Sequence, residues 1–122
     1  MARPVKKRIL VVDNRATLAN GLCELLRESG HDAEAAHSGE AAVKAALATH
    51  PDVIVLDLSM PQMDGFETIA AIKALPDAPQ ATFIAHTAHN DPKTIARVWA
   101  AGFHHHLTKP TTIEKFEEIL SR

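Results

Sequence analysis

The chain has 122 residues, of which 46% are hydrophobic and 23% are charged, and its formal net charge is −2. This length suits one domain with a single core, and the small negative charge gives no reason to expect a nucleic acid partner. No apolar stretch approaches the roughly 20 residues of a membrane span, and the apolar run at 9–12 is too short for a signal peptide. Cys23 has no second cysteine to pair with, so no internal disulfide can form and we expect a cytoplasmic protein. We also expect that it contacts neither membrane nor nucleic acid directly.

The chain begins with a basic leader and then shows a strand pattern followed by a helix pattern. Residues 1–7 form the leader, which we expect to be a flexible, solvated arm. Residues 9–12 are continuously apolar, which predicts a strand buried on both faces. Residues 16–29 predict a helix that Gly30 ends, with an apolar stripe made by Leu18, Leu22, Leu25 and Leu26.

The same alternation of strand and helix patterns continues to the C-terminus. Further strands are predicted at residues 32–36, 53–56, 81–86 and 104–107. Further helices are predicted from a Ser38 cap to residue 49, over 65–75, from a cap at Asn90 or Asp91 to Gly102, and over 112–121. The alternation predicts a single α/β domain over residues 1–122, with a parallel sheet wound by helices on both faces.

Polar side chains follow the predicted strands at the points where the strands end. Asp13 and Asn14 follow the first strand and Asp57 follows the third, while Thr87 and Lys109 follow the fourth and fifth. In open parallel sheets, ligands bind outside the carboxyl ends of the strands. We therefore expect these side chains to converge on one rim of the sheet.

This set of side chains is suited to phosphoryl chemistry. Oxygen ligands beside one fixed cation favour Mg²⁺, and a carboxylate beside Mg²⁺ can attack a phosphoryl group. The metal, the Lys109 ammonium and the Thr87 hydroxyl would then neutralise the phosphoryl oxygens. Asp57 alone could cap a turn and Lys109 alone could be a surface residue, so the prediction depends on their convergence.

The order and spacing of these motifs resemble the receiver domain of two-component response regulators, with a size close to that of the single-domain chemotaxis regulators. The resemblance covers residues 8–121 and is carried by Val11-Val12-Asp13-Asn14, Asp57-Leu-Ser-Met-Pro-Gln-Met-Asp-Gly65, Thr87-Ala88 and Lys109-Pro110. It implies a flavodoxin-like sheet of five parallel strands in the order 2-1-3-4-5, with five helices.

The resemblance also implies a role for each matching residue. Asp57 is the phosphoacceptor, Thr87 is the hydroxyl that moves onto the phosphoryl group, and Lys109 pairs with the phosphate. The Lys109–Pro110 peptide bond is expected to be cis, and Gly65 to permit the turn below the acceptor. Mg²⁺, or another divalent ion such as Mn²⁺, would be held by Asp13, Asn14, Asp57 and the backbone carbonyl of Ser59.

Asn14 departs from the family pattern, which usually has a second acid at this position. An amide oxygen can coordinate a metal but brings no charge, and a unit charge at ~4 Å is worth roughly 4 kcal/mol at an effective dielectric of 20, before solvation offsets most of it. We therefore expect weaker Mg²⁺ binding. The alternative is a pseudo-receiver, a protein-interaction module that works without phosphorylation.

A second departure is His106, where the family often has a tyrosine or phenylalanine that couples to the threonine. His106 could make the switch sensitive to pH, or it could be a plain surface residue, and both interpretations stay open. Ile95 and Trp99, four apart on the predicted fourth helix, could pack in the core or form an exposed patch. We favour the patch, because Ala96 and Ala100 could face the sheet instead. The resemblance makes this face, formed by the fourth helix, the fifth strand and the fifth helix, the output surface.

The resemblance implies a signalling role with protein partners. A histidine kinase or a phosphotransfer protein would donate the phosphoryl group, and the domain would catalyse only its own phosphorylation and hydrolysis. The output surface would contact a downstream target, an output domain missing from this chain, or a second copy in a phosphorylation-linked dimer. A flavin carrier and a Mg²⁺-dependent phosphatase are less well supported, because the first strand lacks a phosphate loop and Ser59 stands where a phosphatase would need an acid.

Overall fold

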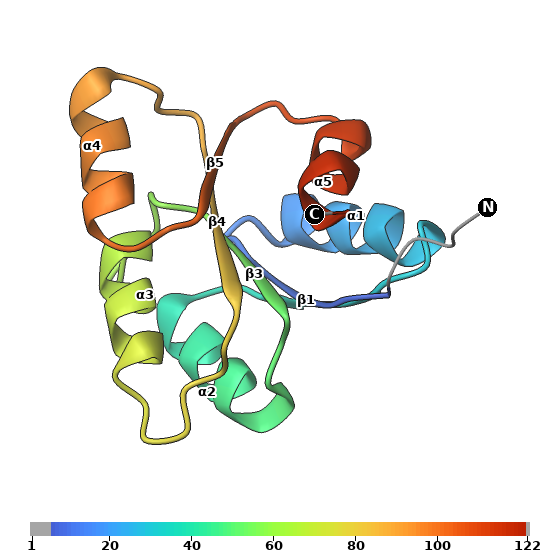
Figure 1. Cartoon of the computed structure of the whole chain (residues 1–122), viewed down its shortest axis with the longest axis horizontal. Helices are drawn as coiled ribbons and strands as arrows, with labels where there is room; N and C mark the ends of the chain where they lie inside the picture. Colours follow the sequence, from blue (N-terminus) through green and yellow to red (C-terminus); the bar gives the residue numbers. More distant parts are fainter. Residues whose placement is uncertain (1–5, 122) are drawn as a thin grey trace.

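The computed structural model describes residues 6–121, in which a β-sheet lies between two layers of helices (Figure 1). The strands are β1 (Arg8–Val12), β2 (Asp32–Ala36), β3 (Val53–Leu56), β4 (Thr82–Thr87) and β5 (His105–Thr108). The helices are α1 (Ala16–Glu28), α2 (Gly39–Thr49), α3 (Gly65–Lys73), α4 (Pro92–Ala100) and α5 (Ile113–Leu120). All strand pairs are parallel and the order is β2-β1-β3-β4-β5, so the predicted doubly wound, flavodoxin-like fold is confirmed.

The sheet separates two apolar clusters, because α1 and α5 cover one face and α2, α3 and α4 cover the other (Figure 1). In β3, Val53 and Val55 pack with the α1 and α5 side, whereas Ile54 and Leu56 pack with the other side. Successive side chains of a strand point to opposite faces, so a strand covered on both faces must be apolar at every position. This explains the unbroken apolar runs before Asp13 and Asp57.

The predicted leucine stripe of α1 is corrected in part: Leu26 is buried and Leu22 packs against the core, whereas Leu18 and Leu25 are exposed. Leu18 and Leu25 are 49% and 47% exposed, while the buried side chains of the helix are Ala19, Cys23 and Leu26. The row at positions 19, 23 and 26 contains two small side chains, which allow a helix to lie close to the sheet. Leu18 and Leu25 each precede a residue of this row by one position. One position is a rotation of about 100° around the helix, which turns both leucines away from the sheet.

The turn between β3 and α3 brings two backbone segments very close together. A Cβ atom on Gly65 would lie 2.6 Å from the carbonyl oxygen of Asp57 and 2.8 Å from Cα of Leu58. The Gly65 amide also donates a hydrogen bond of 3.0 Å to the Leu58 carbonyl. Asp64 then starts α3 with a capping box that includes Glu67. The small size of Gly65 therefore allows α3 to begin directly beside the residue that follows β3.

The remaining boundaries agree with the prediction to within about one residue at β4 and β5, and Asp91 caps α4 by accepting from the Thr94 amide. Residues 1–5 of the predicted leader lie outside the described residues.

Lys7, the last residue of the predicted leader, is attached to the fold, because its amide donates a hydrogen bond of 3.0 Å to His31 Nδ1. None of the helices in residues 6–121 is long and apolar enough to cross a membrane.

Candidate functional site

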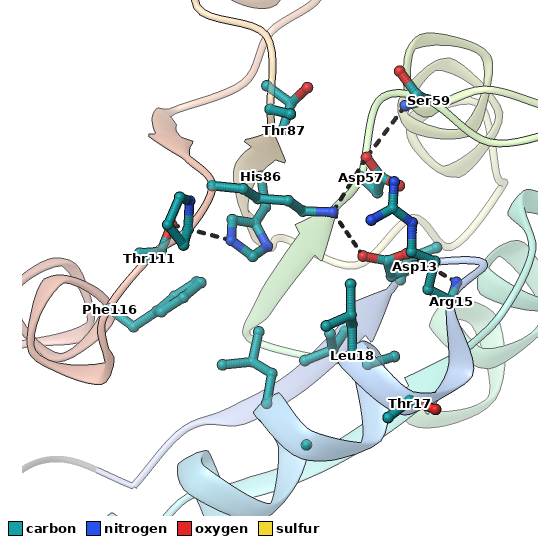
Figure 2. Close-up of a pocket in the computed structure, with 18 of the residues that line it drawn as sticks. Asp13, Arg15, Thr17, Leu18, Asp57, Ser59, His86, Thr87, Thr111 and Phe116 are labelled. Atoms are coloured by element: carbon teal, nitrogen blue, oxygen red, sulfur yellow. Dashed lines mark hydrogen bonds and ion pairs between the residues drawn. The ribbon is translucent and has the colours of Figure 1, made fainter.

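The carboxyl ends of β1, β3, β4 and β5 meet at a cavity of about 630 Å³. Its lining includes Asp13, Asp57, Ser59, Thr87 and Lys109. Figure 2 shows the side chains of Asp13 and Asp57 close together at this cavity. The structure thus brings together the strand-end residues that the sequence suggested, with the exception of the exposed Asn14, which is not part of the lining.

Lys109 forms ion pairs with both carboxylates of the cavity. Its Nζ atom lies 2.8 Å from Asp13 Oδ2 and 3.6 Å from Asp57 Oδ1. Both carboxylates are buried, with relative exposures of 4% and 5%. Burial raises the pKa of Asp57, and the nearby Asp13 charge raises it further, while Lys109 lowers it. The site therefore holds two close carboxylates with one cation between them.

Backbone amides orient both carboxylates. The Ser59 amide donates to Asp57 Oδ1 at 3.3 Å, and the Arg15 amide donates to Asp13 Oδ1 at 2.9 Å. Arg15 also lines the cavity, and its positive charge lowers the pKa of Asp57 slightly. Sequence reasoning missed Arg15, although a cation two residues after a strand-end carboxylate was a usable signal.

The donor set fits Mg²⁺ better than zinc. Mg²⁺ is typically held by one or two carboxylates, with water and phosphate oxygens completing the shell. Asp13 and Asp57 bring two carboxylates to the cavity, and Ser59, which also lines it, has a backbone carbonyl as a possible neutral oxygen ligand. Structural zinc sites are built mainly from Cys and His side chains, which this donor set does not contain.

Thr87 is connected to β5 through the backbone of His89. The buried Thr87 hydroxyl oxygen accepts a hydrogen bond of 3.1 Å from the His89 amide. His106 Nε2 lies 3.3 Å from the His89 carbonyl oxygen, which can only accept, so the imidazole donates. The Lys109 amide donates to the Thr87 carbonyl at 2.8 Å, and the Lys109–Pro110 bond is cis, as expected. Thr87, His106 and Lys109 are thus linked by hydrogen bonds that cross from β4 to β5.

Comparison with known proteins gives a clear assignment. The family model for the response regulator receiver domain matches residues 9–121. This chain belongs to the receiver domain family.

The curated relatives differ in how much of their length this receiver covers. A relative from Rhizobium etli named "Probable chemotaxis protein CheY" is 31% identical over 116 residues, which are 94% of this chain and 90% of that protein. The transcriptional regulatory protein PdtaR of Mycobacterium tuberculosis is 31% identical over 110 residues, which are 89% of this chain. Those residues are 52% of PdtaR, so the receiver spans about half of that relative.

Solved structures of receiver proteins superpose closely on this one. Chemotaxis protein CheY4 of Vibrio cholerae has a TM-score of 0.88 at 26% identity, over 95% of this chain and 97% of that chain. The receiver domain of the sensor histidine kinase PA1611 of Pseudomonas aeruginosa has a TM-score of 0.84 at 25% identity, over 95% of both chains. The PA1611 structure contains a magnesium ion coordinated in its active site cleft.

The expected output face of the receiver carries an exposed aromatic side chain. Trp99 is 50% exposed, and Ile95 is half-buried on the same helix. Ala96 and Ala100 are exposed too, so the idea that they face the sheet is wrong. Val98 fills that place instead and is fully buried.

One cavity residue was not assigned a role from the sequence. His86 precedes Thr87 on β4, and its Nε2 atom lies 3.1 Å from Thr111 Oγ1 (Figure 2). Burial is the main cause that lowers the pKa of His86, to about 4, and the Lys109 charge lowers it further. His86 is therefore uncharged at neutral pH. The sequence signal was a polar residue in the otherwise apolar interior of β4.

Proposed function

We propose that Asp57 accepts a phosphoryl group from the phosphohistidine of a histidine kinase or a phosphotransfer protein, in the cytoplasm and with Mg²⁺ bound. The observation that carries this proposal is the placement of a buried Asp57 carboxylate at the cavity, 3.6 Å from the Lys109 ammonium and with Asp13 beside it. A surface carboxylate that only capped a turn would need neither this burial nor this cation.

The chemical step is an exchange of one bond at phosphorus. An Asp57 carboxylate oxygen attacks the phosphorus atom, the donor's phosphorus–nitrogen bond breaks, and its electron pair stays on the donor imidazole. Lys109 would pair with a phosphoryl oxygen, and the Thr87 hydroxyl would turn toward another. Slow attack by water on the same phosphorus atom would later return Asp57 to its carboxylate form.

The metal would be held by this chain's own oxygen atoms. Asp13, Asp57 and the Ser59 carbonyl are the residues that would hold Mg²⁺, with the Asn14 amide as an additional ligand if its side chain turns toward the cavity. When bound, the ion supplies positive charge for the phosphoryl oxygens. The magnesium ion in the PA1611 receiver supports this assignment.

The surroundings of the cavity support a protein as the phosphoryl donor. Leu18, Leu22 and Leu25 of α1 line the cavity, and two of them are about half exposed. An apolar border beside a charged site is suited to a protein surface that covers it while the reacting group enters the cavity.

We also propose that phosphorylation changes the face formed by α4, β5 and α5. The Thr87 hydroxyl now accepts a hydrogen bond from the His89 amide. If the hydroxyl turns to the phosphoryl group, this hydrogen bond is lost. The His89 carbonyl is held by His106, so the loop after β4 and the β5 side chain would shift together. A downstream target, an output domain or a second copy of the receiver would then recognise the face formed by α4, β5 and α5 in its new form.

The second candidate is a pseudo-receiver that works without phosphorylation. It is favoured by Asn14, which adds no charge and lies exposed outside the cavity lining. The Lys109 ammonium, which already pairs with Asp13 at 2.8 Å, could then hold the site in one state permanently.

Intact mass spectrometry distinguishes the two candidates. The purified chain would be incubated with acetyl phosphate, with and without Mg²⁺, beside the Asp57→Asn variant as control. We expect one phosphoryl group on the wild type, only with Mg²⁺, and none on the variant. If the wild type gains none and also fails to bind beryllofluoride at high Mg²⁺, the pseudo-receiver replaces the active receiver.

A further inference from the structure

His86 is a cavity residue that the proposed phosphoryl transfer does not use. It is half-buried on β4 with its ring edge-on to Phe116 of α5, at a centroid distance of 5.2 Å and an interplanar angle of 78°. Its other contact is the Thr111 hydroxyl, 3.1 Å from Nε2. A polar ring that is mostly removed from water requires such a partner, and the identity of this partner is informative.

The hydrogen bonds of Thr111 determine the direction of its bond with His86. The Thr111 hydroxyl donates its only proton to the Thr108 carbonyl at 2.9 Å. Its oxygen can then only accept from His86, so the imidazole carries its proton on Nε2. The three groups form a chain of donors in which His86 donates to Thr111 and Thr111 donates to Thr108.

This chain of hydrogen bonds encloses the segment that carries Lys109. Thr108 and Thr111 flank the Lys109–Pro110 pair. The hydrogen bond from the Thr111 hydroxyl to the Thr108 carbonyl therefore joins the two ends of this segment, and the hydrogen bond from His86 to Thr111 attaches the segment to β4. The Lys109 amide is also bonded to the Thr87 carbonyl at 2.8 Å, next to His86 in the chain. β4 therefore holds the Lys109 segment at its backbone through Thr87 and at its far end through His86.

The charge state of His86 suits this position. The charged groups that act on its ring are Lys109, on the loop after β5, and Asp13, on the loop after β1, while α5 contributes the uncharged Phe116 ring. A second cation here would repel the Lys109 ammonium. A neutral imidazole holds the segment without competing for Asp13 and Asp57.

We propose that His86 is a positioning residue that sets the Lys109 ammonium between Asp13 and Asp57, acting through Thr111 and the segment between Thr108 and Thr111. The consequence for phosphoryl transfer rests on the proposed function, whereas the placement of Lys109 does not. Removing the His86 donor would let Lys109 withdraw from the carboxylates. The two carboxylates would then attract a divalent cation more strongly, while the phosphoryl group would lose its ammonium partner.

The experiment measures Mg²⁺ affinity by calorimetry and the rate of phosphorylation by acetyl phosphate, on the full chain. His86→Leu removes the donor at similar volume, and Thr111→Val removes the acceptor from the other side. His86→Gln keeps an N–H that can reach the hydroxyl, and His37→Leu makes the same chemical change at an exposed loop residue. Lys109→Ala alone and combined with His86→Leu completes a double-mutant cycle.

We expect His86→Leu and Thr111→Val each to tighten Mg²⁺ binding about threefold and to slow phosphorylation about tenfold, because a nearby cation is displaced. His86→Gln should stay within about twofold of the wild type, and His37→Leu should change neither quantity. In the Lys109→Ala background, His86→Leu should have no further effect on Mg²⁺ affinity. Opposite signs for binding and rate are the essential result, since general loosening of the site would weaken both.

Two results would overturn the inference. The first is an equal Mg²⁺ effect of His86→Leu with and without Lys109, which would show that His86 acts by another route. The second is unchanged affinity and rate in both His86→Leu and Thr111→Val. If the cycle behaves as expected but the wild type gains no phosphoryl group, the positioning role stands and the proposed function fails. If the wild type is phosphorylated but the variants of the cycle change neither the Mg²⁺ affinity nor the rate, the proposed function stands and the positioning role fails.

Discussion

At the scale of single residues, Asp13 and Asp57 are both buried and share the ammonium of Lys109. When both carboxylates are ionised, the three groups sum to one negative charge. A buried uncompensated charge lowers the stability of a fold, and the raised pKa of Asp57 reflects that cost. A divalent cation would neutralise the same excess charge. The charge arrangement that lowers the stability of the metal-free fold therefore favours binding of the cation.

Asp57→Asn is therefore expected to stabilise the metal-free chain at neutral pH, because it removes a charge whose burial raises the pKa of Asp57. Because the folded-state pKa of Asp57 is raised, the folded wild type loses stability as pH increases through that pKa, and the asparagine variant does not. Below the ordinary pKa of aspartate both chains carry a neutral side chain, so the difference should vanish. Urea unfolding at pH 7.5 and at pH 3 measures this, and a variant that is less stable at pH 7.5 would contradict it.

Asn14 can be tested by restoring the acid that the family usually has. Asn14→Asp is expected to tighten Mg²⁺ binding about tenfold, the part of the Coulomb gain that remains after solvation. Asn20→Asp, at an exposed position of α1, is the matched control and should change the affinity little. An unchanged affinity in Asn14→Asp would show that this position, exposed in the structure, does not reach the metal.

At the scale of elements, two glycines in helices have opposite surroundings. A Cβ atom on Gly65 would collide with the backbone of Asp57 and Leu58, whereas a Cβ atom on Gly21, inside α1, would meet nothing within 4 Å. Gly65→Ala should therefore destabilise the chain by about 2 kcal/mol and slow phosphorylation, because the acceptor backbone must move. Gly21→Ala should stabilise it by about 0.5–1 kcal/mol through helix propensity. Thermal unfolding of the pair checks both signs, and equal shifts would refute the steric argument.

The sequence was sufficient to predict the elements and the convergence of the strand-end residues. Continuous apolar runs and caps locate the strands and helices, because burial on both faces and unpaired backbone groups leave direct marks on residue type. The buried row of α1 was predicted only in part, since Leu26 is buried as expected while Leu18 and Leu25, which have the spacing of a core stripe, are exposed and the small Ala19 and Cys23 face the sheet. Periodicity alone does not say how closely a helix approaches its sheet.

The sequence predicted the site residues that directly follow a strand. It did not predict contacts between residues that are far apart in the sequence. Asp13 and Asp57 follow from local pattern. The bond between His86 and Thr111 joins residues that are 25 positions apart, on β4 and on the segment before α5, and no spacing rule connects them. The exposure of Asn14 depends likewise on how the loop after β1 turns.

At the scale of the whole molecule, hydrogen bonds connect the cavity to His106 on β5, a strand of the face that also contains α4 with Trp99. The connection runs from the Thr87 hydroxyl to the His89 backbone and then to His106, all by hydrogen bonds of 3.1 Å and 3.3 Å. Such a connection can shift the population of two arrangements only if phosphorylation changes a bond within it. The Thr87 hydroxyl is the group that can change partner without moving the strand.

In Thr87→Ala, the site is therefore expected to fill as in the wild type, while the environment of Trp99 on α4 responds much less. Trp99 is the single tryptophan of the chain and is 50% exposed, so its fluorescence reports on α4 alone. We expect beryllofluoride with Mg²⁺ to change Trp99 emission in the wild type and in Thr82→Ala, a control at the other end of β4. In Thr87→Ala the mimic should still bind, with less than about a fifth of the emission change, because the His89 amide no longer loses a partner. A full emission change in Thr87→Ala would mean that the signal reaches α4 by a route that does not include the Thr87 hydroxyl.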